Sequence, residues 1–139
     1  MTILDTNVLS ALMKRMPDQQ VIAWADKQPR TSIWTSSVTV LEIRFGLQVM
    51  PLGRRRLELM EVFERVLSDT IEGRIASFDT LAAQFAADLM AVRHKRGRPV
   101  DLRDTMIAGI ALARKATLAT RNITHFQGLA IRVVNPWAA

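Results

Sequence analysis

Short apolar runs alternate with stretches of helical periodicity along the chain, and this alternation constrains the fold more than any other feature of the sequence. The expected strands cover residues 2–4, 33–35, 75–78, 117–119 and 131–134. The expected helices cover residues 6–13, 18–27, 37–50, 54–68, 80–96 and 101–115. Short strands that are apolar throughout are typical of a parallel sheet with helices on both faces. We therefore expect an α/β protein with a mainly parallel sheet.

The chain contains 139 residues, the length of one domain, and shows no internal repeat, low-complexity tract or Ser/Gly-rich linker. We therefore expect a single domain over residues 1–139. The absence of cysteine excludes disulfides, thiolate metal sites and cysteine nucleophiles, and is typical of a reducing compartment. The longest apolar run, residues 107–113, is too short to span a bilayer, and no signal-peptide pattern is present. We expect a cytoplasmic protein without a membrane partner.

The chain carries a surplus of positive charge. Nineteen Lys and Arg residues stand against thirteen Asp and Glu, which gives a formal net charge of +6, and fifteen of the nineteen cations are arginine. Arginine is suited to planar, bidentate contact with phosphate. The charge indicates a polyanionic partner, either a nucleic acid or an acidic protein. Codon usage of the source genome explains the same composition, so charge alone leaves both interpretations open.

Two polar segments follow expected strands directly. Ligands of open parallel sheets bind outside the carboxyl ends of the strands, so functional side chains are expected there. Asp5 follows the first strand, and Thr120-Arg121-Asn122 follows the strand at residues 117–119. Asp5 is also a good helix N-cap and Asn122 a common turn residue, so the structural interpretation stays open for each.

Glu42 lies within the apolar stripe of the helix expected at residues 37–50. The stripe expected to face the core consists of Val38, Leu41, Phe45 and Val49. A carboxylate that faces a packed surface is costly unless it is paired or bound to a metal. We therefore favour a functional role for Glu42, and the alternative is a buried ion pair with one of the many arginines, for example Arg44 or Arg121.

Asp104 repeats this pattern on the helix expected at residues 101–115. It shares one helical face with the core-facing side chains Ile107, Ala108 and Ala111. Small residues, including Gly109, allow this helix to pack closely against a neighbour. We expect Asp101 to be the N-cap. For Asp104 we favour a functional role, with a first-turn charge favoured by the helix dipole as the alternative.

The combination of these acids with many arginines indicates phosphodiester chemistry. Three or four oxygen ligands, without cysteine or a well-placed histidine pair, select Mg²⁺ or Mn²⁺ rather than Zn²⁺. A divalent ion would let carboxylates packed in one cleft stay ionised. The arginines would hold a phosphate backbone while the ion neutralises the scissile phosphate and activates water.

Four segments of the chain resemble a PIN domain. They are residues 3–7 (ILDTN), 37–46 (SVTVLEIRFG), 103–109 (RDTMIAG) and 119–122 (ATRN). The similarity is greatest to toxins of VapBC-type toxin–antitoxin modules, in the VapC/FitB-like branch, and the closing residues 135–137 (NPW) also fit that branch. Four segments in the family's order, from Ile3 to Trp137, make the resemblance specific.

The resemblance implies a three-layer α/β/α sandwich and a Mg²⁺- or Mn²⁺-dependent endoribonuclease that uses metal-activated water. Asp5, Glu42 and Asp104 match the family's metal-binding acids. Asn122 stands where many members carry a fourth acid, which puts a second tightly held ion in doubt, and the implied role of Asn122 is to orient water or metal. The implied supporting residues are Thr6, Asn7 and Thr120, and the candidate phosphate-binding residues are Arg96, Arg98 and Arg121.

The resemblance also implies partners. They are an RNA substrate, a VapB-like antitoxin that blocks the cleft, and a second copy of the chain in a homodimer. His94 and His125 are expected to be surface or loop residues, although His125 occupies a position where some relatives carry an acid.

Two other functions remain as alternatives. A degenerate PIN-like module would bind antitoxin or RNA without turnover, and Asn122 keeps this hypothesis open. A phosphotransferase would use Asp5 as its nucleophile, but Asn7 stands where the haloacid-dehalogenase-like pattern requires a second aspartate.

Overall fold

The computed structural model describes residues 1–98 and 101–139, and it shows the expected alternation of strands and helices. The strands are β1 (Thr2–Leu4), β2 (Ile33–Ser36), β3 (Ile75–Ala76), β4 (Thr117–Ala119) and β5 (Val133–Val134). The helices are α1 (Thr6–Leu12), α2 (Gln19–Asp26), α3 (Ser37–Gln48), α4 (Arg54–Arg65), α5 (Thr80–Lys95) and α6 (Leu102–Arg114). Short helical turns are η1 (Arg30–Ser32), η2 (Val66–Ile71) and η3 (Ile123–Phe126). Pro99, in the expected break before α6, lies outside the described residues.

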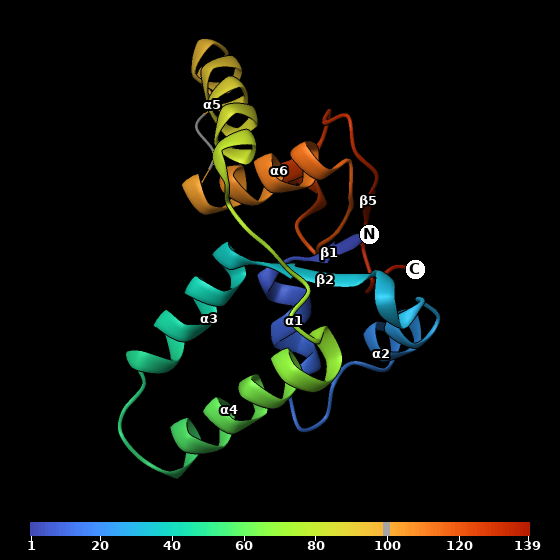
Figure 1. The fold of residues 1–139 in the computed structure, drawn as a ribbon, viewed down its shortest axis with the longest axis vertical. Helices are drawn as coiled ribbons and strands as arrows, with labels where there is room; N and C mark the ends of the chain where they lie inside the picture. The colour runs from blue at the N-terminus through green and yellow to red at the C-terminus, as the bar shows by residue number, and fades with distance from the viewer. Residues whose placement is uncertain (99–100) are drawn as a thin grey trace.

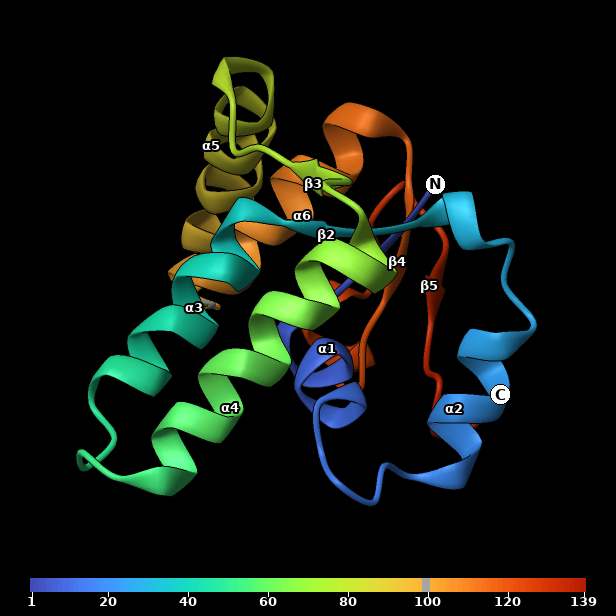
Figure 2. The ribbon, with the colours of Figure 1, turned by 60° about the horizontal axis from the view of Figure 1, so that its bottom comes forward.

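The five strands form one parallel sheet in the order β3-β2-β1-β4-β5 (Figure 2). The chain adds β2 and β3 on one side of β1 and then returns to add β4 and β5 on the other. The strand order therefore reverses between β1 and β4, where Leu4 is paired with Ala119. In open sheets of this kind the crevice outside such a reversal is where ligands bind.

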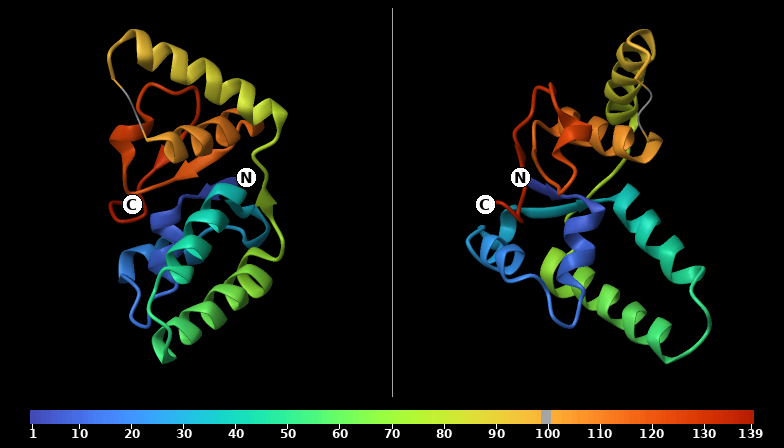
Figure 3. Two further views of the ribbon diagram at one scale, coloured as in Figure 1. Left: turned by 90° about the vertical axis from the view of Figure 1, so that its left-hand side faces the viewer. Right: turned by 180° about the vertical axis from the view of Figure 1, so that it is seen from behind.

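Helices cover both faces of the sheet, which confirms the expected sandwich. Ile3 and Leu118 pack into an apolar cluster with α5 and α6, whereas the neighbouring Leu4 and Ala119 pack into a second cluster with α1 to α4. Successive strand residues point to opposite faces, so these short strands feed both clusters. Figure 1 shows α5 and α6 on one side of the strands and α1 to α4 on the other, and Figure 3 shows the same division.

The close helix packing expected around Gly109 is present between α5 and α6. A Cβ atom on Gly109 would lie 2.5 Å from the carbonyl oxygen of Ala82 and 2.9 Å from Cβ of Ala86. The absence of a side chain therefore sets how closely α6 approaches α5. Since α6 carries Asp104 near its beginning, this packing also places that carboxylate.

The expected orientation of α3 is wrong. Leu41, Phe45 and Val49 are 58%, 57% and 64% exposed, and of the predicted stripe Val38 alone is buried. The buried face of α3 instead carries Val38, Thr39, Ile43 and Leu47. Apolar residues occur on more than one side of this helix, so periodicity could not decide which side faces inward. Contacts with α1, α4 and α6 decide it.

No helix among the described residues is long and apolar enough to cross a membrane.

The N-cap of α3 yields a prediction about stability. Ser36 is fully buried, and its Oγ accepts a hydrogen bond of 3.1 Å from the backbone N–H of Thr39. Ser36→Ala leaves that buried donor without its partner, so we expect the free energy of unfolding to fall by about 1–2 kcal/mol in urea denaturation. Asp18 caps α2 at an exposed position, where water replaces the lost acceptor. Asp18→Ala should therefore have the smaller effect, and equal losses would contradict the prediction.

Candidate active site

Asp5 lies at the reversal point of the sheet, directly after β1. Its Oδ1 accepts a hydrogen bond of 2.8 Å from the backbone N–H of Thr6, so it caps α1. Its Oδ2 accepts a 2.7 Å hydrogen bond from the hydroxyl of Thr120, which follows β4. The side chain thus joins the ends of two neighbouring strands. The structural and functional interpretations of Asp5 are compatible, because the cap also fixes the carboxylate in the crevice.

The carboxylate of Asp5 is buried without a positive partner. The residue is 3% exposed, and no cationic side chain lies within 4 Å of it in the described part of the chain. Burial raises its pKa above the ordinary value, the hydrogen bonds from Thr120 and Thr6 oppose this rise, and the nearby carboxylates of Asp104 and Glu42 add to it. A buried, uncompensated acid facing two others is typical of a functional site.

Glu42 on α3 contacts Thr6, the residue that follows Asp5. Its Oε1 accepts a 2.8 Å hydrogen bond from the hydroxyl of Thr6, and its Oε2 is 3.7 Å from Nη1 of Arg103. The ion-pair alternative is correct in that an arginine lies within 4 Å of Glu42, but the partner is Arg103 and neither Arg44 nor Arg121. Arg44 pairs with Glu64 at 2.8 Å, and the guanidinium of Arg121 lies 4.9 Å from the ring centre of Trp137.

Asp104 reaches the crevice from the first turn of α6. Asp101 is the N-cap, as expected, and accepts hydrogen bonds from the backbone N–H groups of Arg103 and Asp104. The side chain of Asp104 is 18% exposed, and its Oδ2 is 2.7 Å from Nδ1 of His125. The three acids predicted from the sequence therefore come from the cap of α1, the middle of α3 and the first turn of α6, and the charges of Glu42 and Asp104 both act on Asp5.

Polar residues after β1 and β4 tie this edge together. Nδ2 of Asn7 lies 3.5 Å from Oδ2 of Asp5, and Oδ1 of Asn7 accepts a 3.2 Å hydrogen bond from the backbone N–H of Arg121. The hydroxyl of Thr120 accepts a 3.0 Å hydrogen bond from the backbone N–H of Asn122. The side chain of Asn122 is exposed and forms no hydrogen bond within the described ranges, so its role stays a prediction.

The sequence analysis predicted no role at the site for two residues that contact it. His125 contacts Asp104, and the signal that could have found it is its position three residues after Asn122, where some relatives carry an acid. Arg93 on α5 donates to the carbonyl of His125 at 2.7 Å and lies 3.4 Å from the hydroxyl of Thr105. Burial lowers the pKa of Arg93, and Asp104 partly offsets this. No local pattern distinguishes Arg93 from the other cations of the chain.

The predicted phosphate-binding arginines lie apart from these contacts. Arg96 and Arg98 are exposed at the end of α5, and their side chains form no ion pair or hydrogen bond with any other described residue. Arg103 is instead the guanidinium nearest to a site carboxylate, at 3.7 Å from Glu42. Phosphate binding by Arg96, Arg98 and Arg121 stays a prediction.

The donors at this site match a hard divalent cation in chemistry and charge. Hydroxyl groups hold Asp5 and Glu42 and an imidazole holds Asp104, and Glu42 alone of the three has a guanidinium within 4 Å in the described residues. Within residues 1–98 and 101–139, however, no three acidic or histidine side chains are gathered closely enough to hold one metal ion together. The charges of Glu42 and Asp104 thus act on Asp5, but the three carboxylates do not form a complete coordination shell.

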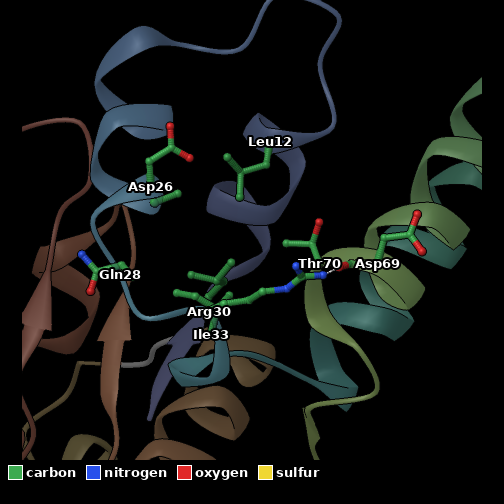
Figure 4. Close-up of a pocket in the computed structure, with 9 residues that line it drawn as sticks. Leu12, Asp26, Gln28, Arg30, Ile33, Asp69 and Thr70 are labelled. Carbon is green, nitrogen blue, oxygen red and sulfur yellow. Dashed lines mark hydrogen bonds between the residues drawn. The ribbon is translucent and has the colours of Figure 1, made fainter.

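A pocket of about 420 Å³ lies elsewhere, between α1, α2 and the turn η2 (Figure 4). Arg30 extends across it and donates a 2.7 Å hydrogen bond to the carbonyl of Asp69. Asp26 lines it as well, but none of the three converging acids does. The pocket is therefore separate from the acid cluster at the sheet edge.

The fold and this cluster define a class of α/β proteins in which acids gather at the carboxyl edge of a parallel sheet. The chain belongs to the PIN-domain family, whose model matches residues 2–130. It is 39% identical over 137 residues to a VapC ribonuclease of Sinorhizobium fredii, covering 99% of this chain and 98% of that one. It is 31% identical over 137 residues to the toxin FitB of Neisseria gonorrhoeae, covering 99% of each. The crystal structure of FitAcB from that organism superposes with a TM-score of 0.89 at 31% identity and covers 100% of both chains.

Proposed function

We propose that this PIN-domain protein, as a single domain over residues 1–139, is a Mg²⁺- or Mn²⁺-dependent endoribonuclease and the toxin of a toxin–antitoxin pair. The observation that carries the proposal is the buried carboxylate of Asp5, which has no cationic partner in the described residues and whose pKa is raised further by the charges of Asp104 and Glu42. The similarity over nearly the whole chain to a VapC ribonuclease and to the toxin FitB supports it.

The side chains of the crevice have separate tasks in this proposal. Asp5, Asp104 and Glu42 hold the cation, and the hydroxyls of Thr6 and Thr120 orient two of these carboxylates. The bound ion supplies charge neutralisation at the scissile phosphate and activation of the attacking water. Asn122, which is exposed after β4, orients water through its amide in this proposal. Arg121, Arg96 and Arg98 bind phosphates that flank the scissile one.

The proposal includes protein partners. A VapB-like antitoxin that covers the crevice is supported by the similarity to FitB in its FitAcB structure. A homodimer would cover apolar surface, and the exposed side chains of Leu41, Phe45 and Val49 on α3 provide such surface. We propose that the protein acts in the cytoplasm, where its RNA substrate is made.

Removal of divalent cations tests the proposed activity. Total RNA incubated with the purified chain and Mg²⁺ should acquire new, discrete ends, which sequencing of RNA ends identifies along with the substrate and the site of cleavage. Addition of excess chelator should abolish these ends, and Mn²⁺ should restore them. Equal cleavage with and without chelator would contradict the role of the cation, and no new ends under any condition would contradict the nuclease.

A degenerate module that binds without turnover is the second candidate. Two observations favour it: an amide replaces an acid at Asn122, and no three acidic or histidine groups of the described residues lie close enough to hold an ion together. Calorimetric titration separates the two candidates. Heat of binding with Mg²⁺ or Mn²⁺ that disappears in Asp5→Asn favours the enzyme, whereas no uptake even at millimolar concentrations favours the degenerate module.

A further inference from the structure

The imidazole of His125 contacts the acid cluster, although the sequence indicated an ordinary loop residue. Its Nδ1 lies 2.7 Å from Oδ2 of Asp104. Because an ionised carboxylate only accepts hydrogen bonds, this geometry assigns the proton to Nδ1. We propose that His125 is a positioning residue of the candidate metal centre, which fixes the carboxylate of Asp104 through this hydrogen bond. The inference rests on the proposed function and extends it to a residue outside the acid set.

The fold holds His125 against Asp104 from several directions. Arg93 donates to the carbonyl of His125 at 2.7 Å, and its second nitrogen lies 3.4 Å from the hydroxyl of Thr105, the residue after Asp104. The backbone N–H of His125 donates to the carbonyl of Asn122 at 3.0 Å. The following residue, Phe126, is 1% exposed and belongs to the apolar cluster under α5 and α6. The guanidinium of Arg93 thus links the segment that carries His125 to the segment that carries Asp104. The contact between His125 and Asp104 is therefore preorganised.

The hydrogen bond makes the two carboxylate oxygens of Asp104 unequal. Oδ2 is taken by His125, whereas Oδ1 has no hydrogen-bond partner in the part of the chain that the structure describes. The charge of Asp104 also adds to the rise in the pKa of Asp5, so the two carboxylates influence each other electrostatically. A ligating carboxylate is normally held in this way by a donor on one oxygen, and loss of such a donor weakens metal binding.

The position of His125 in the chain supports the same role. Asn122 contributes no negative charge after β4, and the side chain three residues later reaches Asp104. An imidazole there adds a hydrogen-bond donor and no negative charge. His125 thus holds Asp104 as the hydroxyls of Thr6 and Thr120 hold Glu42 and Asp5.

Binding of Mn²⁺ to the full-length chain tests the inference without any measurement of RNA cleavage. Free Mn²⁺ is followed by its electron paramagnetic resonance signal during titration of the wild type and of three variants. His125→Ala should weaken Mn²⁺ binding roughly 10–100-fold, as expected for loss of an orienting donor. His125→Asn should retain most of the affinity, because its Nδ2 occupies the position of Nδ1. His125→Gln should behave like His125→Ala, because its donor lies one bond farther from the backbone.

His94→Ala is the matched control, since His94 is exposed on α5 and makes no side-chain hydrogen bond to another described residue. It should bind Mn²⁺ as the wild type does, and thermal unfolding checks that every variant is folded. Wild-type affinity in His125→Ala, or equal weakening in His125→Asn and His125→Gln, overturns the inference alone. If His125→Ala does not fold, the Mn²⁺ affinities of His125→Asn and His125→Gln are compared instead, and this comparison tests the inference. A wild type that takes up no Mn²⁺ overturns both the inference and the proposed metal dependence.

Discussion

RNA cleavage by Asp5→Asn is expected to fall at least about 100-fold below that of the wild type in the presence of Mg²⁺. The substitution removes the buried charge around which Glu42 and Asp104 are arranged, while it keeps the size of the side chain. The amide oxygen still accepts from the backbone N–H of Thr6, so α1 keeps its cap. Single-turnover cleavage of an RNA identified by end sequencing measures the loss.

The same variant should be more stable than the wild type when divalent cations are absent. Burial raises the pKa of Asp5, so the native state binds this proton more tightly than the unfolded chain does. Its contribution to stability is fully present below the ordinary carboxyl pKa and is lost as the pH rises through the raised native pKa. The amide of Asp5→Asn does not titrate, so the stability advantage of the variant should grow over that window and then level off. We expect a rise in Tm of a few degrees at neutral pH.

Added Mg²⁺ should affect the Tm of the wild type and the Tm of Asp5→Asn differently. It should raise the Tm of the wild type, because a ligand that binds the native state stabilises it, and it should leave Asp5→Asn nearly unchanged. Full cleavage activity in Asp5→Asn would exclude this carboxylate from the chemistry. A variant less stable than the wild type at neutral pH would show that the hydrogen bonds of Asp5 outweigh its burial.

Gly109→Ala is expected to destabilise the protein by about 3 kcal/mol or more, which is the largest stability effect that we predict. The new Cβ would lie 2.5 Å from the carbonyl oxygen of Ala82 and 3.1 Å from the backbone N of Ala86. These atoms belong to the backbone of α5 and cannot rotate away, so the two helices must separate. Urea denaturation measures the loss. RNA cleavage should fall as well, because α6 carries Asp104.

Gly46→Ala is the matched control, since it makes the same substitution in another helix. Gly46 lies in α3, and nothing lies within 4 Å of the position of its new Cβ. Alanine is the better helix former, so this variant should gain about 0.5–1 kcal/mol. Close contact with α5, and not helix propensity, is expected to decide the stability of Gly109→Ala. A change in stability of the same sign in Gly109→Ala and Gly46→Ala would contradict this.

The sequence predicted the strands and helices well, because most of their signals are local. Asp5 and Asp101 were expected as caps, and Asp18, Ser36 and Asp79 stand at or directly before the starts of expected helices; each of the five caps its helix with a side-chain oxygen. The side of α3 that faces inward was predicted wrongly. Its local pattern contains apolar residues on several sides, and the choice between them depends on neighbours that are distant in the chain.

The residues of the candidate site also fall into those that local sequence signals predict and those that they do not. A carboxylate after a strand, or an acid on a core-facing helical stripe, is visible in the sequence, so Asp5 and Asp104 were found by sound arguments. Glu42 was found by an argument that the orientation of α3 overturns, and the match to the PIN-domain segments was its better support. His125 and Arg93 were missed because their relevance lies in contacts with residues up to 32 positions away.

The sequence by itself determined the class of fold, the helix caps and the kinds of ligand atom available, since these follow from periodicity and from residue chemistry within a few positions. Only the tertiary structure decided which hydroxyl holds which carboxylate, that an imidazole meets Asp104, and that Asp5 lacks a counter-charge. The physical reason is that hydrogen bonding and burial are properties of neighbours in space. A sheet whose strand order reverses between β1 and β4 brings those neighbours from opposite ends of the chain.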